Sequence, residues 1–356
     1  MSATPTETPT PPARRSPLKL VINIAVGLAF SALFIWLATR NVAWDEFMAG
    51  ARQLKLWPVV VYGLILSLTH ALRMLRWGLT LRPMAPIPWS RIVAVGAVGM
   101  MAIFALPARL GELVRPLLIS EDKRVTVGQA TATIVVERLA DGLCVSLMLF
   151  VTVLLLDPDQ VAPEYIYSGA AAASVFGGAS LALLMSGLLY RWIERPLTSL
   201  LGRVSPTLAD RVLGTIEGFF MALKLISSPR TAIPYILCTA AIWAVTGIGT
   251  AILFSAFPAP LNELGLLAGF AVLSVLVVGI MIPAGPGTVG VFHWAVVFGL
   301  GMFLIPESQA FLFGTLLHLM IALINIGYGT LAWIVGDVRP GAVWRRRAGA
   351  SEEVAP

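Results

Sequence analysis

Eight charged residues stand inside or at the ends of long apolar segments, where side chains able to do chemistry are uncommon. They are Arg73, Arg76, Arg109, Glu112, Arg115, Glu137, Arg138 and Asp141. A charge in hydrocarbon is costly unless it meets a partner or a water-filled cavity, so such residues usually serve function. Guanidinium groups bind phosphate oxygens in pairs, and carboxylates can balance arginines while a site is empty. We therefore predict that these eight side chains bind a polar group, most simply a phosphate.

The spacing of these residues predicts which of them share a helix face. Arg73 and Arg76 are three residues apart, while Glu137 and Asp141 are four apart with Arg138 beside them. Residues at these spacings are neighbours on a helix surface. Each set is thus expected to face one way.

A structural interpretation of the same charges stays open. The first arginine pair would then anchor a helix end at the membrane surface. The other charges would form buried ion pairs that only lock helices together. Those groups would be Glu112–Arg115 and Glu137–Arg138–Asp141.

Two breaks interrupt apolar segments, at residues 106–112 (LPARLGE) and 283–288 (PAGPGT). The apolar arm before the first break, residues 92–106, is too short to cross a bilayer alone. Irregular backbone at membrane depth is tolerated only within protein or beside a wet cavity. The breaks share Pro-Ala-x-x-Gly, and we expect their helix ends to face the site. The break residues predicted to line it are Pro107, Gly111, Pro283, Gly285, Pro286 and Gly287.

The composition identifies the class of protein. Of 356 residues, 58% are hydrophobic and 12% are charged, against about 25% charged in a soluble domain, and the mean hydropathy is +0.85. Apolar runs long enough to cross a membrane recur, which predicts an all-α polytopic membrane protein. We expect about six to eight transmembrane helices with one or two re-entrant broken helices. The net charge of +6 comes from basic loops beside apolar runs, so a nucleic-acid partner is not expected.

The elements that must hold the charges follow from the apolar runs. Residues 1–17 are predicted to be a disordered cytoplasmic tail, residues 18–337 a single transmembrane domain, and residues 338–356 a basic cytoplasmic tail. Spans are expected at residues 20–38, 57–79, 126–156, 166–190, 231–257 and 309–335, with an amphipathic interfacial segment at 41–56 and apolar arms at 110–120, 264–282 and 289–305.

Basic residues predict the topology. They flank the N-terminus, the end of the second span, the loop 190–230 and the C-terminus, so both termini are expected in the cytoplasm of a plasma-membrane protein. This requires the first break to enter and leave on one side. The second break can be re-entrant from outside or cross twice. Residues 57–165 and 231–337 would then be inverted half-repeats with the site between them.

Four motifs carry a resemblance to a known family. They are Arg73-x-x-Arg76-Trp77, LPARLGELVR at 106–115, VVERLAD at 135–141 and PAGPGTVG at 283–290. Together they resemble the transmembrane region of lysylphosphatidylglycerol synthase, a flippase-like family, over about residues 18–337. The resemblance implies lipid flipping. Aminoacyl transfer belongs to a separate soluble domain, which is not expected here because the chain ends soon after Val335.

We therefore expect a flippase-like protein that moves or binds an anionic or lipid-linked headgroup. A phospholipid, a polyprenyl phosphate or a hopanoid-related lipid would each fit the resemblance. A membrane-embedded transferase acting on a lipid phosphate and a non-transporting accessory of a lipid-modifying enzyme remain alternatives. No cofactor or metal is predicted, because no metal-binding or nucleotide-binding spacing is present. The histidines His293 and His318 and the cysteines Cys144 and Cys238 are expected to be buried helix residues.

Overall fold

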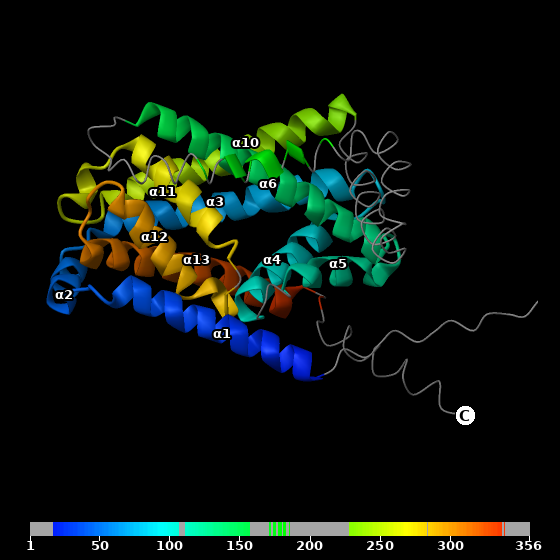
Figure 1. Ribbon diagram of the computed structural model, residues 1–356. Coiled ribbons are helices and arrows are strands. Elements are labelled where there is room, and N and C mark those ends of the chain that lie inside the picture. The colour runs from blue at the N-terminus through cyan, green and yellow to red at the C-terminus, as the bar shows by residue number, and fades with distance from the viewer. Residues whose placement is uncertain are drawn as a thin grey trace, which may run out of the picture.

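The structure is a computed structural model that describes residues 17–106, 111–156, 228–282, 284–336 and 338, with short stretches between 171 and 185. All regular elements of the described residues are helices (Figure 1). This confirms the predicted all-α polytopic class. The predicted tails, apart from Pro17 and Val338, lie outside the described residues. So do the loop 190–230, apart from residues 228–230, and most of the predicted span 166–190.

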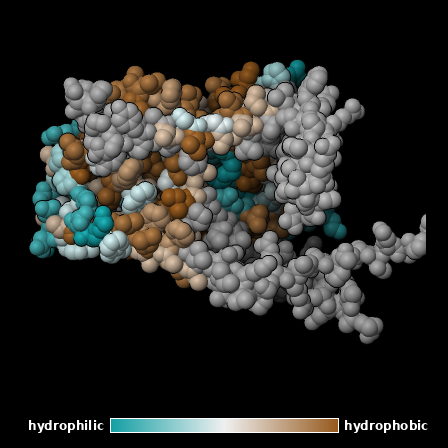
Figure 2. Space-filling view, in the orientation of Figure 1, coloured by the Kyte–Doolittle hydropathy of each residue, from teal (hydrophilic) through white to brown (hydrophobic). Residues whose placement is uncertain are grey.

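Four helices in the described part of the chain are long and apolar enough to cross a membrane. They are α3 (Leu56–Leu81), α6 (Val127–Leu155), α10 (Pro229–Phe254) and α13 (Glu307–Val335). Each lies within a few residues of a predicted span. On the face that Figure 2 shows, apolar side chains cover much of the surface, as a lipid-facing surface requires, and hydrophilic ones gather at the left end and in a smaller patch near the middle.

The N-terminal helix α1 (Pro17–Thr39) and the short helix α2 (Trp44–Arg52) border this bundle. Helix α2 has Asp45 and Glu46 in its first turn and Arg52 in its last, so its charges suit the helix dipole. It lies at the hydrophilic end of the molecule (Figures 1 and 2). It falls within the segment 41–56, whose place at the membrane interface stays a prediction.

Two short hairpins pack against the four long helices. The first is α4 (Trp89–Ala105) and α5 (Val114–Ile119), and the second is α11 (Leu266–Gly279) and α12 (Val291–Gly301). The chain therefore repeats one order twice: long helix, short helix, break, short helix, long helix.

The two halves run in opposite directions where they meet. Thr69 of α3 lies opposite Thr246 of α10, with 3.5 Å between the hydroxyl oxygens. Further along α3, Arg76 donates to Thr239, which is nearer the start of α10. Contacts that advance on one helix and recede on the other mean that α3 and α10 are antiparallel. An inverted repeat requires this orientation of α3 and α10, and the repeat itself stays a prediction.

Glycines allow the arms of each hairpin to lie against one another. A Cβ at Gly99 would meet the Arg115 side chain, and a Cβ at Gly111 would meet the backbone of Ala102. In the second hairpin, a Cβ at Gly279 would meet Ala295. Both hairpins thus turn back on themselves at their breaks.

The breaks of the two hairpins lie together. Gly287 belongs to the 3₁₀ turn η4 (Pro286–Thr288), and a Cβ there would lie 3.7 Å from the Phe104 ring at the end of α4. Helix α1 supports the same turn, because Ser31 Oγ accepts a hydrogen bond from the Gly285 backbone N–H at 2.9 Å. Gly290 has a φ of 91°, and a Cβ there would approach the Ser31 carbonyl oxygen to 2.3 Å. Only glycine satisfies both conditions at this position.

Local sequence fixes the start of α6, the helix that carries three of the predicted site residues. Thr126 accepts a hydrogen bond from the Gln129 backbone N–H at 3.1 Å, and the Gln129 side chain accepts one from the Thr126 backbone N–H at 2.9 Å. This reciprocal capping box satisfies two backbone donors that have no partner within the helix.

Candidate functional site

The charged residues predicted from sequence meet at one internal cavity of about 320 Å³. Seven of the eight line its wall: Arg73, Arg76, Glu112, Arg115, Glu137, Arg138 and Asp141. The eighth, Arg109, lies outside the described residues. Helices α3, α5 and α6, together with the turn before α5, supply all of these charges.

Asp141 joins three helices at the cavity wall. Its carboxylate accepts hydrogen bonds from both terminal nitrogens of Arg76, at 2.6 and 3.0 Å. Trp243 of α10 donates its indole N–H to the same carboxylate at 3.0 Å. Arg76 is only 1% exposed, so it is not a surface anchor, and that interpretation of Arg76 is wrong. The paired geometry of an arginine and a carboxylate is among the stronger hydrogen-bonding arrangements.

A second buried pair joins α5 to α6. Arg115 donates to the two oxygens of Glu137 at 2.9 and 3.2 Å. The guanidinium carbon of Arg115 also lies 4.1 Å from the centre of the Trp77 ring on α3, a cation–π geometry. Trp77 in turn donates its indole N–H to Thr133 at 3.0 Å. One arginine therefore ties the first hairpin to two long helices.

The third pair is looser and more exposed. Arg138 lies 3.4 Å from Glu112, with 47% of the arginine side chain exposed. The local groups expected under the structural interpretation, Glu112–Arg115 and Glu137–Arg138–Asp141, are therefore wrong in their partners. Each carboxylate pairs with an arginine of another element.

Arg73 differs from the other three arginines of the cavity. Its guanidinium carbon lies 5.7 Å from the Trp243 ring, and it forms no ion pair with a carboxylate of the described residues. Four arginines thus face three carboxylates in the described wall. The described wall therefore has a surplus of positive charge, which an anion can neutralise.

Much of the cavity wall is apolar. Helices α11, α12 and α13 supply the side chains Val272, Leu276, Val277, Phe292, Leu317, Ile321 and Ile324. In the described wall all of the charges come from the first half of the chain, whereas both halves contribute apolar side chains. The cavity is therefore amphipathic, and it suits a ligand with a charged group and an apolar part.

The predicted break residues lie in different places around the cavity. Gly285 is part of the described wall, and the neighbouring Thr288 joins it. Gly111, Pro286 and Gly287 do not line it in the described part of the chain. Gly111 and Gly287 instead allow the arms and tips of the hairpins to lie close together. Pro107 and Pro283 lie outside the described residues.

Sequence reasoning missed the uncharged polar residues of the wall. They are Tyr62, Thr69, His70, Thr246, Thr250 and Asn325. A signal was present for two of them, because Thr69 and His70 precede Arg73 at spacings that share its helix face. The others are single polar residues in apolar runs, which sequence alone does not orient.

No group of three or more His, Cys, Asp or Glu that could hold a metal ion occurs among the described residues. Cys144 and Cys238 are free thiols. His293 and His318 are buried, but they are not isolated, since their rings lie 5.1 Å apart. His318 Nε2 is 2.8 Å from the Gly287 carbonyl oxygen, so this histidine supports the second break.

Comparison with known proteins agrees with the architecture. The family model described as Lysylphosphatidylglycerol synthase TM region matches residues 24–329, most of the chain. No curated protein matches the chain.

Proposed function

Since the chain belongs to the lysylphosphatidylglycerol synthase transmembrane-region family, a membrane family related to lipid handling, we propose that it is a lipid flippase. Its substrate would be an anionic phospholipid or another lipid-linked phosphate. The headgroup would pass between leaflets through the central cavity while the acyl chains stay in hydrocarbon.

The uncompensated charge of Arg73 is the observation that carries this proposal. Arg76, Arg115 and Arg138 each have a carboxylate partner, so they hold the wall together without an added ligand. Arg73 has no such partner in the described chain. A partly buried cation of this kind is stabilised by an incoming anion, because the charged oxygens of a phosphate accept hydrogen bonds from its guanidinium group.

The amphipathic wall favours a lipid over a free anion. An inorganic anion gains nothing from the apolar side chains of α11 and α13. The glycerol and upper acyl region of a phospholipid can pack against them. Ligand sites of this type combine a mostly apolar lining with a few polar groups that fix orientation.

The hairpins supply the route. We propose that the first is re-entrant from the cytoplasm and the second from outside, with both termini cytoplasmic in a plasma membrane. The contact between Phe104 and Gly287 would then separate the two openings of the cavity. Rocking of one half against the other would expose the headgroup site to each leaflet in turn.

Reconstitution in vesicles tests the proposal through Arg73→Gln. Wild-type protein should carry fluorescent phosphatidylglycerol from the inner to the outer leaflet, where dithionite bleaches it. The variant should move it about tenfold more slowly, as expected from losing one charge-assisted contact. Arg73→Lys should retain part of the rate because it keeps the charge.

The matched control is Arg52→Gln, which removes one exposed arginine from the end of α2. It should transport as wild type does, and all variants should show equal thermal stability in detergent. Wild type that leaves the inner-leaflet label protected would refute the flippase proposal. An Arg73→Gln rate equal to the control would refute the role of Arg73.

A further inference from the structure

A second cavity of about 610 Å³ lies where α3 passes into α4 and α10 begins. It shares no described residue with the central cavity. Its wall combines the turn after α3 with Arg230 and Thr231 of α10, and most of the remaining wall is apolar or proline. It is therefore a separate site with its own chemistry.

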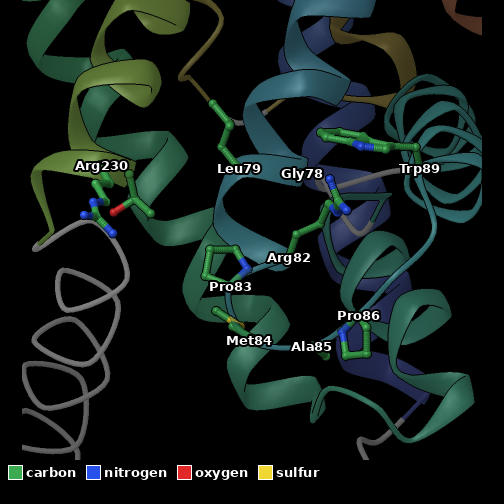
Figure 3. A pocket seen from close by; sticks show the side chains of 10 residues that line it. Gly78, Leu79, Arg82, Pro83, Met84, Ala85, Pro86, Trp89 and Arg230 are labelled. Carbon is green, nitrogen blue, oxygen red and sulfur yellow. The ribbon is translucent and has the colours of Figure 1, made fainter.

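Two arginines give this pocket its charge. Arg82 and Arg230 both line it, and the described lining contains no carboxylate. Figure 3 shows Arg230 on one side of the pocket and Arg82 with Trp89 on the other, with Leu79 and Pro83 between them. Neither arginine forms an ion pair with a described carboxylate. Among the described residues, the positive charge of this pocket has no carboxylate partner.

An aromatic ring holds Arg82 in position. The guanidinium carbon of Arg82 lies 5.1 Å from the centre of the Trp89 ring. The ring rests on Gly78, where a Cβ would come within 2.1 Å of it. A guanidinium stacked on an aromatic face keeps its N–H groups available at its edge. The glycine and the tryptophan thus pre-arrange Arg82 for an acceptor.

The position of the pocket suits a membrane surface. It lies at the end of the long apolar helix α3 and at the start of α10, next to the turn that contains Pro83 and Pro86. Tryptophan is enriched at the level of lipid headgroups, and arginine is enriched on the cytoplasmic side. Basic pockets between transmembrane helices on that side bind anionic lipid headgroups.

We infer that this pocket binds the phosphate of an anionic lipid headgroup from the surrounding leaflet, independently of transport through the central cavity. The shared chemistry is a phosphate group in a pocket that both Arg82 and Arg230 line. A lipid is the expected source of this phosphate. The pocket is larger than a free phosphate ion, and its apolar lining would make no favourable contact with that ion.

Photocrosslinking tests this inference in the full-length protein reconstituted into phosphatidylcholine vesicles. A photoactivatable phosphatidylglycerol, labelled in its headgroup, should crosslink to the segment 78–89. Unlabelled phosphatidylglycerol should compete, while phosphatidylcholine and inorganic phosphate should not. Arg82→Gln or Arg230→Gln should each raise about fivefold the concentration of unlabelled phosphatidylglycerol that halves the crosslinking. This is the effect expected for one arginine near a membrane surface.

Lys123→Gln is the matched control, since Lys123 is exposed, lies between α5 and α6 and lines neither cavity. It should crosslink as wild type does. Trp89→Leu, which keeps both arginines, should weaken binding without changing the charge.

Competition by inorganic phosphate would make the site one for the free anion and overturn the lipid assignment. Crosslinking to segment 78–89 that persists in the double variant Arg82→Gln/Arg230→Gln would overturn the site itself. Neither result bears on the flippase proposal, which rests on Arg73.

Discussion

Replacing Asp141 by asparagine is expected to lower the free energy of unfolding by about 3–5 kcal/mol, the cost of breaking a buried ion pair by removing one partner. Arg76 is 1% exposed and would keep its charge with no carboxylate beside it. The indole N–H of Trp243, which donates to the same carboxylate, would lose a charged acceptor as well. Unfolding of the purified protein in mixed micelles titrated with dodecyl sulfate measures the change.

Two variants isolate the cause. Glu112→Gln removes the partner of Arg138 from a looser, partly exposed pair at 3.4 Å, and it should cost no more than about 1 kcal/mol. The double variant Arg76→Met/Asp141→Leu removes both charges together and should regain most of the stability, because apolar residues often replace buried ion pairs without loss. If Asp141→Asn costs no more than Glu112→Gln, the three-helix junction is not the stabilising element described above.

The long helices were predictable because a membrane imposes a minimum apolar length. Helix α3 begins at Leu56 and α13 ends at Val335, both within one residue of the predicted bounds. The hairpins followed from proline and glycine within runs that were too short to span. In both cases the constraint acts on neighbouring residues in the sequence, so the prediction does not depend on knowing which distant residues they contact.

The partners of the charges were not predictable by the same reasoning. Glu112 and Arg115 are three apart, but α5 begins only at Val114, so helical spacing does not apply between them. Arg115 instead meets Glu137, because the hairpin turns back against α6. Arg138 is adjacent to Glu137 in sequence, yet neighbouring residues on a helix point in different directions. Arg138 is therefore more exposed, and it reaches Glu112 instead.

The uncharged polar wall escaped prediction for a different reason. Thr246 and Thr250 donate their hydroxyl groups to backbone carbonyls four residues earlier in α10. A threonine that satisfies its donor within its own helix is tolerated on any face in a membrane. Its presence in an apolar run therefore does not reveal that it faces a cavity. A charged side chain cannot be satisfied by the backbone of its own helix in this way. The arginines and carboxylates therefore indicated the site from sequence.

The division between a charged wall and an apolar wall also follows from the repeat. The two halves have the same order of helices, but the charges of the cavity occur in α3, α5 and α6, and α11 to α13 contribute hydrocarbon. Two halves with the same order of helices and unequal charge thus line one amphipathic cavity. A fully symmetric pair would hold charge on both sides, and the headgroup would have no preferred orientation.

The turn of the first hairpin depends on Gly111, and Gly111→Ala is expected to damage it. An added Cβ would lie 2.3 Å from three backbone atoms of Ala102 and Ile103. Backbone cannot rotate away as a flexible side chain does, so the arms must separate. Overpacking a well-packed site costs typically about 1–3 kcal/mol, and we expect a loss at the upper end of that range, measured as above in mixed micelles. Separation of the arms would also displace Arg115 from Glu137, so lipid translocation should fall together with stability.

Gly327→Ala controls for the chemistry of the substitution. Gly327 lies within α13 and has no neighbour within 4 Å of an added Cβ. Alanine has a helix propensity higher than that of glycine by up to about 1 kcal/mol, so this variant should be as stable as wild type or slightly more so. The two variants add the same methyl group, and only the surroundings differ. Equal stability of Gly111→Ala and Gly327→Ala would mean that the arms of the first hairpin do not touch as closely as the structure has them, and that Arg115 reaches Glu137 without the help of this turn.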